Sequence, residues 1–200
     1  MPAYLIGDTQ VLDAEIYDEY QRRAIRSIKA VKACALAATE QVIALEGDWC
    51  PRRLILIEYP DLSTLRSWYY SDEYQELKEL RLRGARSDIR LVEGVEALPS
   101  FDRQGNEGYV LADVGEATGA EIEDYRRRVP GSVEQFGGRF IVRGGQSERV
   151  EGSREPQRTV VIEFPSLEVA RRWYDSDEYS ELAALRQRNS SGSLFAVNGL

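Results

Sequence analysis

The chain has 200 residues, of which 42% are hydrophobic and 30% charged, a balance typical of globular domains. Its 34 acidic and 26 basic residues give a net charge of −8, and the scattered basic residues make nucleic acid and anionic membranes unexpected partners. Histidine is absent, which excludes a Ser-His-Asp triad, histidine-ligated haem and nearly all catalytic zinc sites. No stretch is apolar enough to span a bilayer and no secretory signal is evident, so a cytoplasmic location is expected.

The first half of the chain predicts six elements in the order strand, helix, strand, strand, helix, strand. Hydrophobic period and capping residues define them. They are a strand at Tyr4–Asp8, a helix capped by Asp13, a strand within Lys32–Glu40, a strand at Arg53–Tyr59 ended by Pro60, a helix capped by Asp61 that breaks at Ser71-Asp72, and a strand at Ile89–Val92.

The second half repeats this pattern. Shifting the sequence by 105 residues aligns 4–95 with 109–200 without a gap and gives 29 identities in 92 positions, far above chance. A period of about a hundred residues is too long for a solenoid and is typical of a duplicated domain. We therefore expect two homologous domains, 1–95 and 109–200, joined by a linker at 96–108 that is rich in turn-forming residues.

This element order is that of the split ferredoxin-like sandwich, a four-stranded antiparallel sheet with two helices on one face. The other face of each sheet would be apolar and bare, and packing the two copies sheet to sheet would bury it. The predicted fold class is therefore α+β, with two ferredoxin-like βαββαβ repeats forming an intrachain pseudo-dimer. The protein would be a monomer of this kind or a homodimer of it.

Four segments carry a family resemblance: GGRFIVRGG (Gly137–Gly145), EGDW with PRR (Glu46–Arg53), VIEFPSLEVARRWYDS with EY (Val161–Tyr179) and LVEG (Leu91–Gly94). They closely resemble the uncharacterised domain-of-unknown-function family numbered 1330, in both repeats. The resemblance implies a dimeric α+β barrel. Relatives in that superfamily include cofactor-free monooxygenases, lactone isomerases, polyketide cyclases and haem-degrading enzymes, and the missing histidine disfavours the last.

The two repeats depart from the family pattern in different places. The first has lost the glycine pairs and arginines of the strand at Arg139–Arg143. The second has Ser191-Gly192-Ser193 where the first has Arg86-Ser87-Asp88. In dimeric α+β barrels the second strand of one half typically adjoins the last strand of the other. We therefore hypothesise one composite site lined by Arg139–Arg143 and Arg86–Asp88; the alternative is neutral drift after duplication.

Four strand-borne carboxylates are candidate general bases. Glu58 and Glu163 lie near the ends of the central strands, and Asp8 and Asp113 end the first strands. Partial burial would raise their pKa toward a value useful in proton abstraction. The alternatives are an ion pair with an arginine for the glutamates and a turn role for the aspartates.

Arginines and aromatic residues are the candidate substrate-binding groups. Arg143 is expected to stabilise an oxyanion, a task that suits a planar guanidinium. The further candidates are Arg53, Arg86, Asp88, Arg139, Arg158, Tyr4, Tyr109, Trp49, Trp68 and Trp173, together with the tyrosine pairs Tyr20/Tyr125 and Tyr74/Tyr179. Aromatic residues at this spacing also suit core packing, which is the alternative.

Neither a metal nor a cofactor is expected. The two cysteines, Cys34 and Cys50, cannot close a four-ligand site and are expected to be reduced. GGRFIVRGG lacks the GxGxxG register and predicts a hairpin strand rather than a phosphate loop.

Together these residues predict a cofactor-independent enzyme of small-molecule metabolism, acting on an aromatic or polyketide-like substrate. It would catalyse cyclisation, isomerisation or lactone rearrangement by carboxylate proton transfer with arginine stabilisation of the oxyanion. The alternatives are a cofactor-free monooxygenase of a phenolic substrate and a non-catalytic ligand-binding or stress module.

Overall fold

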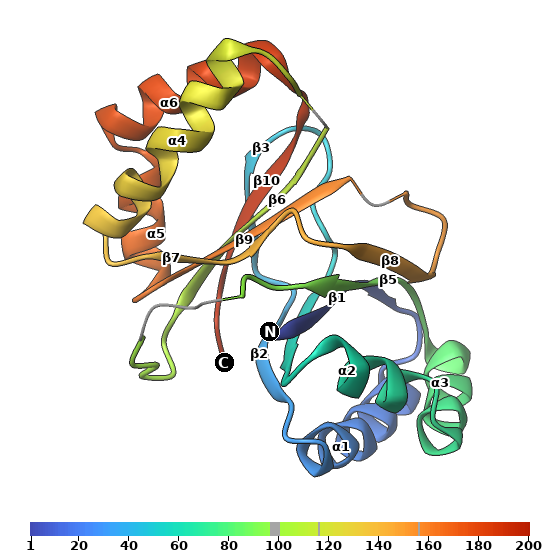
Figure 1. The fold of residues 1–200 in the computed structure, drawn as a ribbon. Coiled ribbons are helices and arrows are strands. Elements are labelled where there is room, and N and C mark those ends of the chain that lie inside the picture. Colours follow the sequence, from blue (N-terminus) through green and yellow to red (C-terminus); the bar gives the residue numbers. More distant parts are fainter. Residues whose placement is uncertain (97–100, 116, 156) are drawn as a thin grey trace. The chain divides into compact units, whose positions relative to one another are not determined.

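The computed structural model describes residues 1–96, 101–115, 117–155 and 157–200. The chain folds into two compact units, each built mainly from one repeat (Figure 1). The first unit consists of Met1–Glu40, Pro51–Glu96 and Gln146–Pro156, and the second of Gln41–Cys50, Ala97–Gly145 and Gln157–Leu200. Part of the predicted linker at 96–108 lies outside the described residues, and strand β6 begins at its last residue, Gly108.

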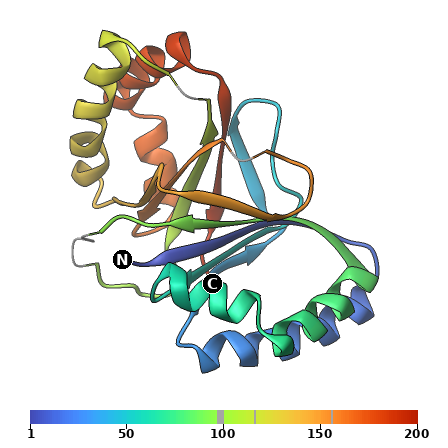
Figure 2. The same ribbon diagram turned by 45° about the vertical axis from the view of Figure 1, so that its right-hand side comes forward.

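The first unit is a five-stranded antiparallel sheet in the order β2-β4-β1-β5-β8. Its strands are β1 (Ala3–Val11), β2 (Cys34–Thr39), β4 (Leu54–Tyr59), β5 (Ala85–Glu93) and β8 (Ser147–Glu151). Its helices are α1 (Ala14–Ala30), α2 (Leu62–Tyr69) and α3 (Asp72–Gly84). The helices cover one face of this sheet, as Figure 2 shows from a second direction.

The second unit repeats this arrangement, with strand order β3-β10-β6-β9-β7 and all neighbours antiparallel. Its strands are β3 (Val42–Glu46), β6 (Gly108–Val114), β7 (Arg139–Arg143), β9 (Arg158–Phe164) and β10 (Gly192–Asn198). Its helices are α4 (Ala120–Gln135), α5 (Leu167–Tyr174) and α6 (Asp177–Asn189), again on one face of the sheet.

One strand of each repeat joins the sheet of the other repeat. β3 belongs to the first repeat and pairs with β10, whereas β8 belongs to the second repeat and pairs with β5. The prediction of four strands per repeat was therefore incomplete. The predicted hairpin at Gly144-Gly145 was wrong, because β7 pairs with β9 and the chain after the glycines leaves for the other sheet.

The local signals for helix ends are confirmed. The side chains of Asp13, Asp61 and Ser71 each accept a hydrogen bond from a backbone N–H in the first turn of the helix that follows. The break at Ser71 turns the chain so that Trp68 stacks on Tyr74, with ring centroids 3.9 Å apart. The second unit has the same stack between Trp173 and Tyr179, also at 3.9 Å.

The predicted fold class is confirmed: the chain is an α+β protein of two ferredoxin-like repeats, linked as a pseudo-dimer by the exchange of one strand in each direction. Both cysteines are free thiols. Within the described parts of the chain, no helix has the length and apolar character that a membrane span requires.

Candidate functional site

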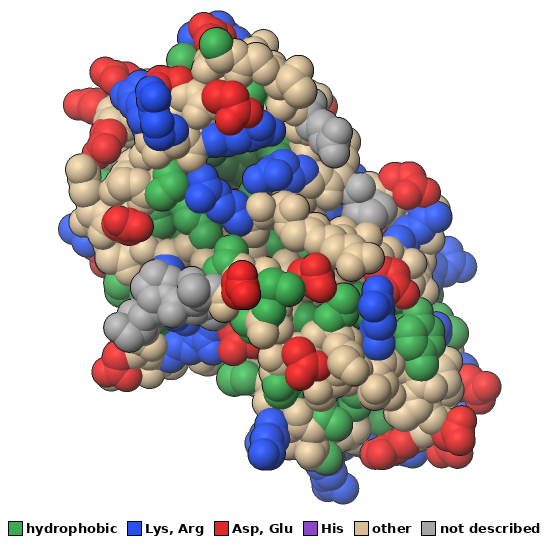
Figure 3. All heavy atoms as spheres, viewed as in Figure 1, with side chains coloured by type: hydrophobic (Ala, Val, Ile, Leu, Met, Phe, Trp, Pro, Cys, Tyr) green, Lys and Arg blue, Asp and Glu red, His purple; other side chains and the backbone are tan. Residues whose placement is uncertain are grey.

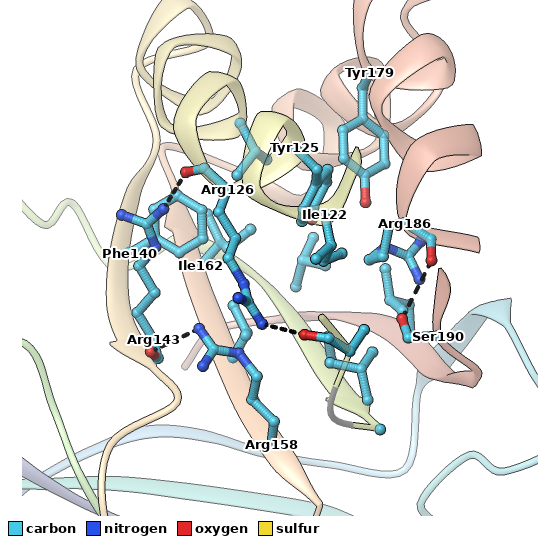
Figure 4. A pocket seen from close by; sticks show the side chains of 18 of the residues that line it. Ile122, Tyr125, Arg126, Phe140, Arg143, Arg158, Ile162, Tyr179, Arg186 and Ser190 are labelled. Carbon is cyan, nitrogen blue, oxygen red and sulfur yellow. Dashed lines mark hydrogen bonds between the residues drawn. The ribbon is translucent and has the colours of Figure 1, made fainter. Parts of the chain in front are cut away.

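The second unit contains a cavity between its sheet and helices α4 and α6 (Figure 4). Its volume is about 60 Å³ measured for the centres of water-sized spheres. One water needs roughly 10–15 Å³ on that measure, so the cavity has room for a small ligand such as a single substituted ring. The walls are mostly apolar side chains from the sheet and the helices: Val110, Ala112, Val114, Ile122, Val129, Phe140, Val160, Ile162, Trp173 and Leu194.

Strand geometry selects which residues face this cavity. Side chains alternate between the two faces of a strand, so Arg158, Val160 and Ile162 of β9 line it while the residues between them face the opposite side. On β7 a register shift between Phe140 and Val142 interrupts the alternation. Because of that irregularity, Phe140 and Arg143 both face the cavity although they are three residues apart.

Three arginines gather at one side of the cavity: Arg126 of α4, Arg143 of β7 and Arg158 of β9. Each donates to a backbone carbonyl: Arg126 to Ala117 at 2.9 Å, Arg143 to Arg126 at 2.6 Å, and Arg158 to Arg143 at 3.1 Å. In Figure 3 basic side chains surround a hollow with an apolar floor.

Gly144 makes this cluster sterically feasible. It has a φ of +74°, a conformation that favours glycine, and a Cβ at this position would lie within 2.5 Å of the Arg158 guanidinium. Gly144, which follows the strand Arg139–Arg143, therefore makes room for an arginine instead of closing a hairpin.

Among the described residues that line the cavity, none is acidic. Arg126 pairs with Glu123 on the exposed side of α4, at 2.5 Å. Three guanidinium groups gathered beside apolar walls attract an anion, because burial strengthens the interaction with their charge. The site is therefore suited to a small anion with an apolar body.

The opposite side of the cavity is formed by Tyr179, Arg186 and Ser190, and Tyr125 lies between this side and the three arginines. Burial raises the pKa of both tyrosines, so their hydroxyls stay protonated at neutral pH. Nη2 of Arg186 lies 2.6 and 2.8 Å from the two carboxylate oxygens of Glu46, which is on the exchanged strand β3. Burial tends to raise the pKa of Glu46, but the charge and hydrogen bond of Arg186, together with hydrogen bonds from Gln187 and Tyr174, outweigh burial and lower the pKa.

The corresponding region of the first unit has different residues. Tyr17, Gln21 and Ala38 occupy the positions of Ile122, Arg126 and Arg143. Tyr17 is buried, and the Arg53 guanidinium lies 5.5 Å from the centre of its ring and pairs with Glu40 at 3.1 Å. The arginine cluster is thus particular to the second unit.

The structure places Glu163 away from this cavity. It lies on β9 between cavity-facing positions and is completely buried. Its carboxylate accepts hydrogen bonds from Arg103 at 2.6 Å, Arg139 at 2.8 Å and the Tyr109 hydroxyl at 3.0 Å. This is the ion-pair arrangement that the sequence left open as the alternative to a base.

The other three candidate bases also lie outside the cavity. Asp113 is buried on β6 between the cavity-lining Ala112 and Val114, so it faces the opposite side of the sheet. In the first unit, Glu58 accepts from the Tyr4 hydroxyl at 3.2 Å, and Asp8 accepts from the backbone N–H of Arg52 at 2.9 Å. Burial raises the pKa of Asp8.

The residues of the hypothesised composite site belong to different units, Arg139–Arg143 to the second and Arg86–Asp88 to the first. Asp88 accepts from the backbone N–H groups of Ser153 and Arg154 at 2.7 and 2.9 Å, and Arg86 is exposed on β5. The strand beside β5 is β8 and not β7, so the expected adjacency of the second strand to the other repeat's last strand was wrong. The position beside β5 is occupied by β8, the third strand of the second repeat.

The aromatic candidates divide between core and cavity. Trp68 donates to Ser27 at 3.1 Å within the core of the first unit, and Trp49 packs edge-on against Phe195. Trp173, Tyr125 and Tyr179 line the cavity.

Sequence reasoning singled out five residues that line the cavity: Arg143, Arg158, Trp173, Tyr125 and Tyr179. It missed Arg126 and Arg186, which reach the cavity from helices. Arg126 stands where the first repeat has Gln21, so a comparison of the two repeats position by position could have found it. Within the described residues no group of three or more Asp, Glu or Cys side chains could hold a metal ion.

Several solved structures share the fold at low sequence identity. A protein of Lactobacillus acidophilus that is provisionally named a monooxygenase matches with a TM-score of 0.54 and 14% identity, covering 98% of this chain and 93% of its own. A second provisionally named monooxygenase, from Fusobacterium nucleatum, has a TM-score of 0.55 and 8% identity, covering 100% and 92%. An anthrone oxidase-like protein has a TM-score of 0.54 and 11% identity, covering 100% and 91%.

No curated protein matches the sequence. The solved structures establish only that the fold is shared. Their sequence identities to this chain are too low to show a common function. The model of one protein family, the domain of unknown function DUF1330, matches the sequence twice, at residues 2–95 and 107–200. The chain is therefore a tandem member of the DUF1330 family.

Proposed function

We propose that the protein is an enzyme of small-molecule metabolism whose substrate is a small aromatic or polyketide-like anion bound in the cavity of the second unit. The observation that supports this most is the cluster of Arg126, Arg143 and Arg158 over an apolar cavity. The apolar walls would hold a ring, and the guanidinium groups would hold a carboxylate, phenolate or enolate.

The arginines would also stabilise negative charge that develops during the reaction. An enolate or phenolate oxygen next to Arg143 gains more from the guanidinium than the neutral substrate does, which lowers the barrier to proton loss. This is the oxyanion role that the sequence predicted for Arg143. The four candidate carboxylate bases do not line the cavity, so we propose that the substrate is acidic enough to lose its proton to water or a tyrosine-bound water. Cyclisation, isomerisation and lactone rearrangement all proceed through such an anion.

Oxidation by dioxygen is a second candidate reaction, favoured by one specific observation. The solved structures of the same fold include proteins named as monooxygenases and an anthrone oxidase-like protein. The carbanion of an electron-rich phenol, once stabilised by arginines, can itself reduce dioxygen without a bound cofactor. Trp173 and Tyr179 would then orient the ring in the cavity.

Calorimetric titration with 4-hydroxybenzoate tests the binding site. We expect Arg143→Ala and Arg158→Ala each to weaken binding by about tenfold or more, the effect of losing one charge-assisted contact. The matched control is Arg127→Ala, which removes an arginine next to Arg126 on α4 whose side chain is 78% exposed and pairs with Asp124. Equal weakening by the control, or no saturable binding of the wild type, would overturn the proposed site.

Turnover tests the proposed activity and separates the candidate reactions. Purified metal-free protein is incubated with enolisable 1,3-dicarbonyl compounds and electron-rich phenols while dioxygen is recorded and products are identified by mass. Arginine-dependent product formation without dioxygen uptake supports isomerase or cyclase chemistry, and uptake supports the oxygenase. Binding with no turnover of any of these compounds would leave a ligand-binding module and contradict the proposal of an enzyme.

A further inference from the structure

Arg186 places a buried guanidinium group at the cavity, where it also interacts with the side chains of Tyr125 and Tyr179. Its side chain is 5% exposed and lines the cavity. Nη2 binds Glu46, whereas the Nε–H group is buried and has no hydrogen-bond partner among the described residues. Buried donors are normally paired, so an unpaired one beside a cavity is available to an acceptor supplied from outside.

The equivalent arginine of the first unit makes an informative comparison. Arg81 binds Glu151 on the exchanged strand β8 at 2.5 Å, as Arg186 binds Glu46. In addition, Nη1 of Arg81 donates to the Ser87 hydroxyl at 2.9 Å, and that hydroxyl lies 2.9 Å from Thr9 Oγ1. The Nε of Arg81 is also unpartnered, so the difference between the units lies at Nη1.

The second unit has lost both hydroxyls of this network. Gly192 and Val114 stand at the positions of Ser87 and Thr9. A Cβ on Gly192 would lie 2.6 Å from the backbone oxygen of Asp113, so the backbone there leaves no room for a serine. Val114 lines the cavity. Arg186 therefore lacks the hydroxyl acceptors that Arg81 finds in Ser87 and Thr9, in the unit that has the arginine-lined cavity.

The two polar sides of the cavity lie apart. In Figure 4, Arg126, Arg143 and Arg158 are on one side, Arg186 and Tyr179 are on the other, and Ile122 and Tyr125 lie between them. The charge of Arg186 is already balanced by Glu46, so this buried side offers N–H donors without net positive charge. It is suited to a neutral oxygen, whereas the three arginines on the other side are suited to an anion.

We propose that Arg186 is a substrate-binding residue whose N–H groups hold a neutral hydroxyl or carbonyl oxygen of the ligand, while the three arginines hold its anionic group. This rests on the proposed function and narrows the substrate class to hydroxy- or oxo-substituted aromatic acids and their polyketide-like analogues. A plain apolar acid would leave the donors of Arg186 unpaired and would bind more weakly.

Two acids of nearly equal size, 4-hydroxybenzoate and 4-methylbenzoate, test the inference by calorimetric titration. Wild-type protein is expected to bind the hydroxy acid about tenfold more tightly. Arg186→Lys keeps a positive charge for Glu46 but removes the guanidinium donors, so it should abolish this preference while binding of 4-methylbenzoate changes less than twofold. Arg81→Lys is the matched control and should retain the preference, because it alters the same ion pair in the first unit.

The outcomes separate this inference from the proposed function. If Arg186→Lys weakens both acids equally, or Arg81→Lys abolishes the preference as well, Arg186 has a structural role only and the inference is wrong. Binding that depends on Arg143 but shows no preference for the hydroxyl also contradicts the inference and leaves the proposed function standing. If neither acid binds, both fall.

A measurement on the wild type covers the case in which Arg186→Lys does not fold. Nitrogen-15 NMR resolves arginine Nε–H groups, and the Arg186 signal can be assigned by selective labelling and comparison with Arg81→Lys. Titration with 4-hydroxybenzoate should shift this signal downfield, as expected for a new hydrogen bond, and 4-methylbenzoate should not. An unchanged Arg186 signal in the presence of saturating 4-hydroxybenzoate would overturn the inference.

Discussion

The carboxylate of Glu163 is completely buried, yet Arg103, Arg139 and the Tyr109 hydroxyl all donate to it. Two arginines and a hydroxyl thus hold this carboxylate inside the fold, so the residue is suited to stabilising the second unit. Its role is then testable through stability.

We expect Glu163→Gln to lower the free energy of unfolding by about 3 kcal/mol, because it leaves two arginines without their buried counter-charge. The matched control is Glu58→Gln at the equivalent position of the first unit, where the glutamate is less buried and the loss should be smaller. Urea unfolding measures both. A well-folded Glu163→Gln protein that binds 4-hydroxybenzoate but has lost all turnover would instead show that Glu163 is the base.

For Asp8 we expect the opposite effect on stability: replacing its carboxylate should raise the free energy of unfolding. Burial raises its pKa above the ordinary 3.8, so the folded state disfavours the ionised form. The ionised carboxylate therefore destabilises the folded protein at neutral pH. This destabilisation disappears as pH falls below about 3.8, where the carboxyl is protonated in both the folded and the unfolded state. Asp8→Asn should therefore raise stability at pH 7, with the gain vanishing near pH 3.

The helix cap Asp61 serves as the control for this pH dependence. A backbone hydrogen bond from Thr64 lowers its pKa, so its ionised form favours the folded state. Asp61→Asn should reduce stability at pH 7 and have no effect at low pH, as measured by urea unfolding. Asp8→Asn and Asp61→Asn shifting stability in the same direction at pH 7 would contradict the assignment for Asp8.

At the scale of the elements, local signals and long-range pairing differ in how well the sequence reveals them. Helices α2 and α3 could be predicted with their break, because caps and periodicity lie within a few residues of each other. Strands β3 and β8 could not, because each is five residues long and finds its partner strand in the other repeat. Nothing in the polar segment Ser147–Glu151 indicates a strand until β5 is beside it.

The cavity was only partly predictable for a related reason. Arg143 and Arg158 could be singled out because guanidinium groups on strands are unusual, and the structure places both at the cavity. Arg126 and Arg186 were missed because an arginine on a helix normally faces solvent. The carboxylate candidates were placed wrongly because the sequence does not show which face of each strand the helices cover. Neighbouring side chains on a strand point to opposite faces, so Ile162 faces the cavity and Glu163 faces away from it.

At the scale of the whole molecule, duplication has given each half of the chain a structural role in the other. The first repeat supplies β3 to the second unit, and its Glu46 binds Arg186 in the cavity wall. The second repeat supplies β8 to the first unit, where Glu151 binds Arg81. The two units have diverged in their cavity residues but retain this reciprocal exchange, so neither repeat completes its own sheet alone.

Cutting the chain between the repeats tests this dependence. Cleavage at a protease site inserted at the exposed residues 104–106 would break the covalent link between the halves and leave every strand intact. The fragments are expected to elute together at the mass of the uncut protein and to part only in denaturant, because each contributes a strand to the other's sheet. Arg186 would keep its contact with Glu46, so the cut protein should bind 4-hydroxybenzoate within about twofold of the uncut chain, a difference under about 0.5 kcal/mol. Elution of two separate, folded fragments in native buffer would show that each repeat closes its own sheet, and the exchange of β3 and β8 would have to be abandoned.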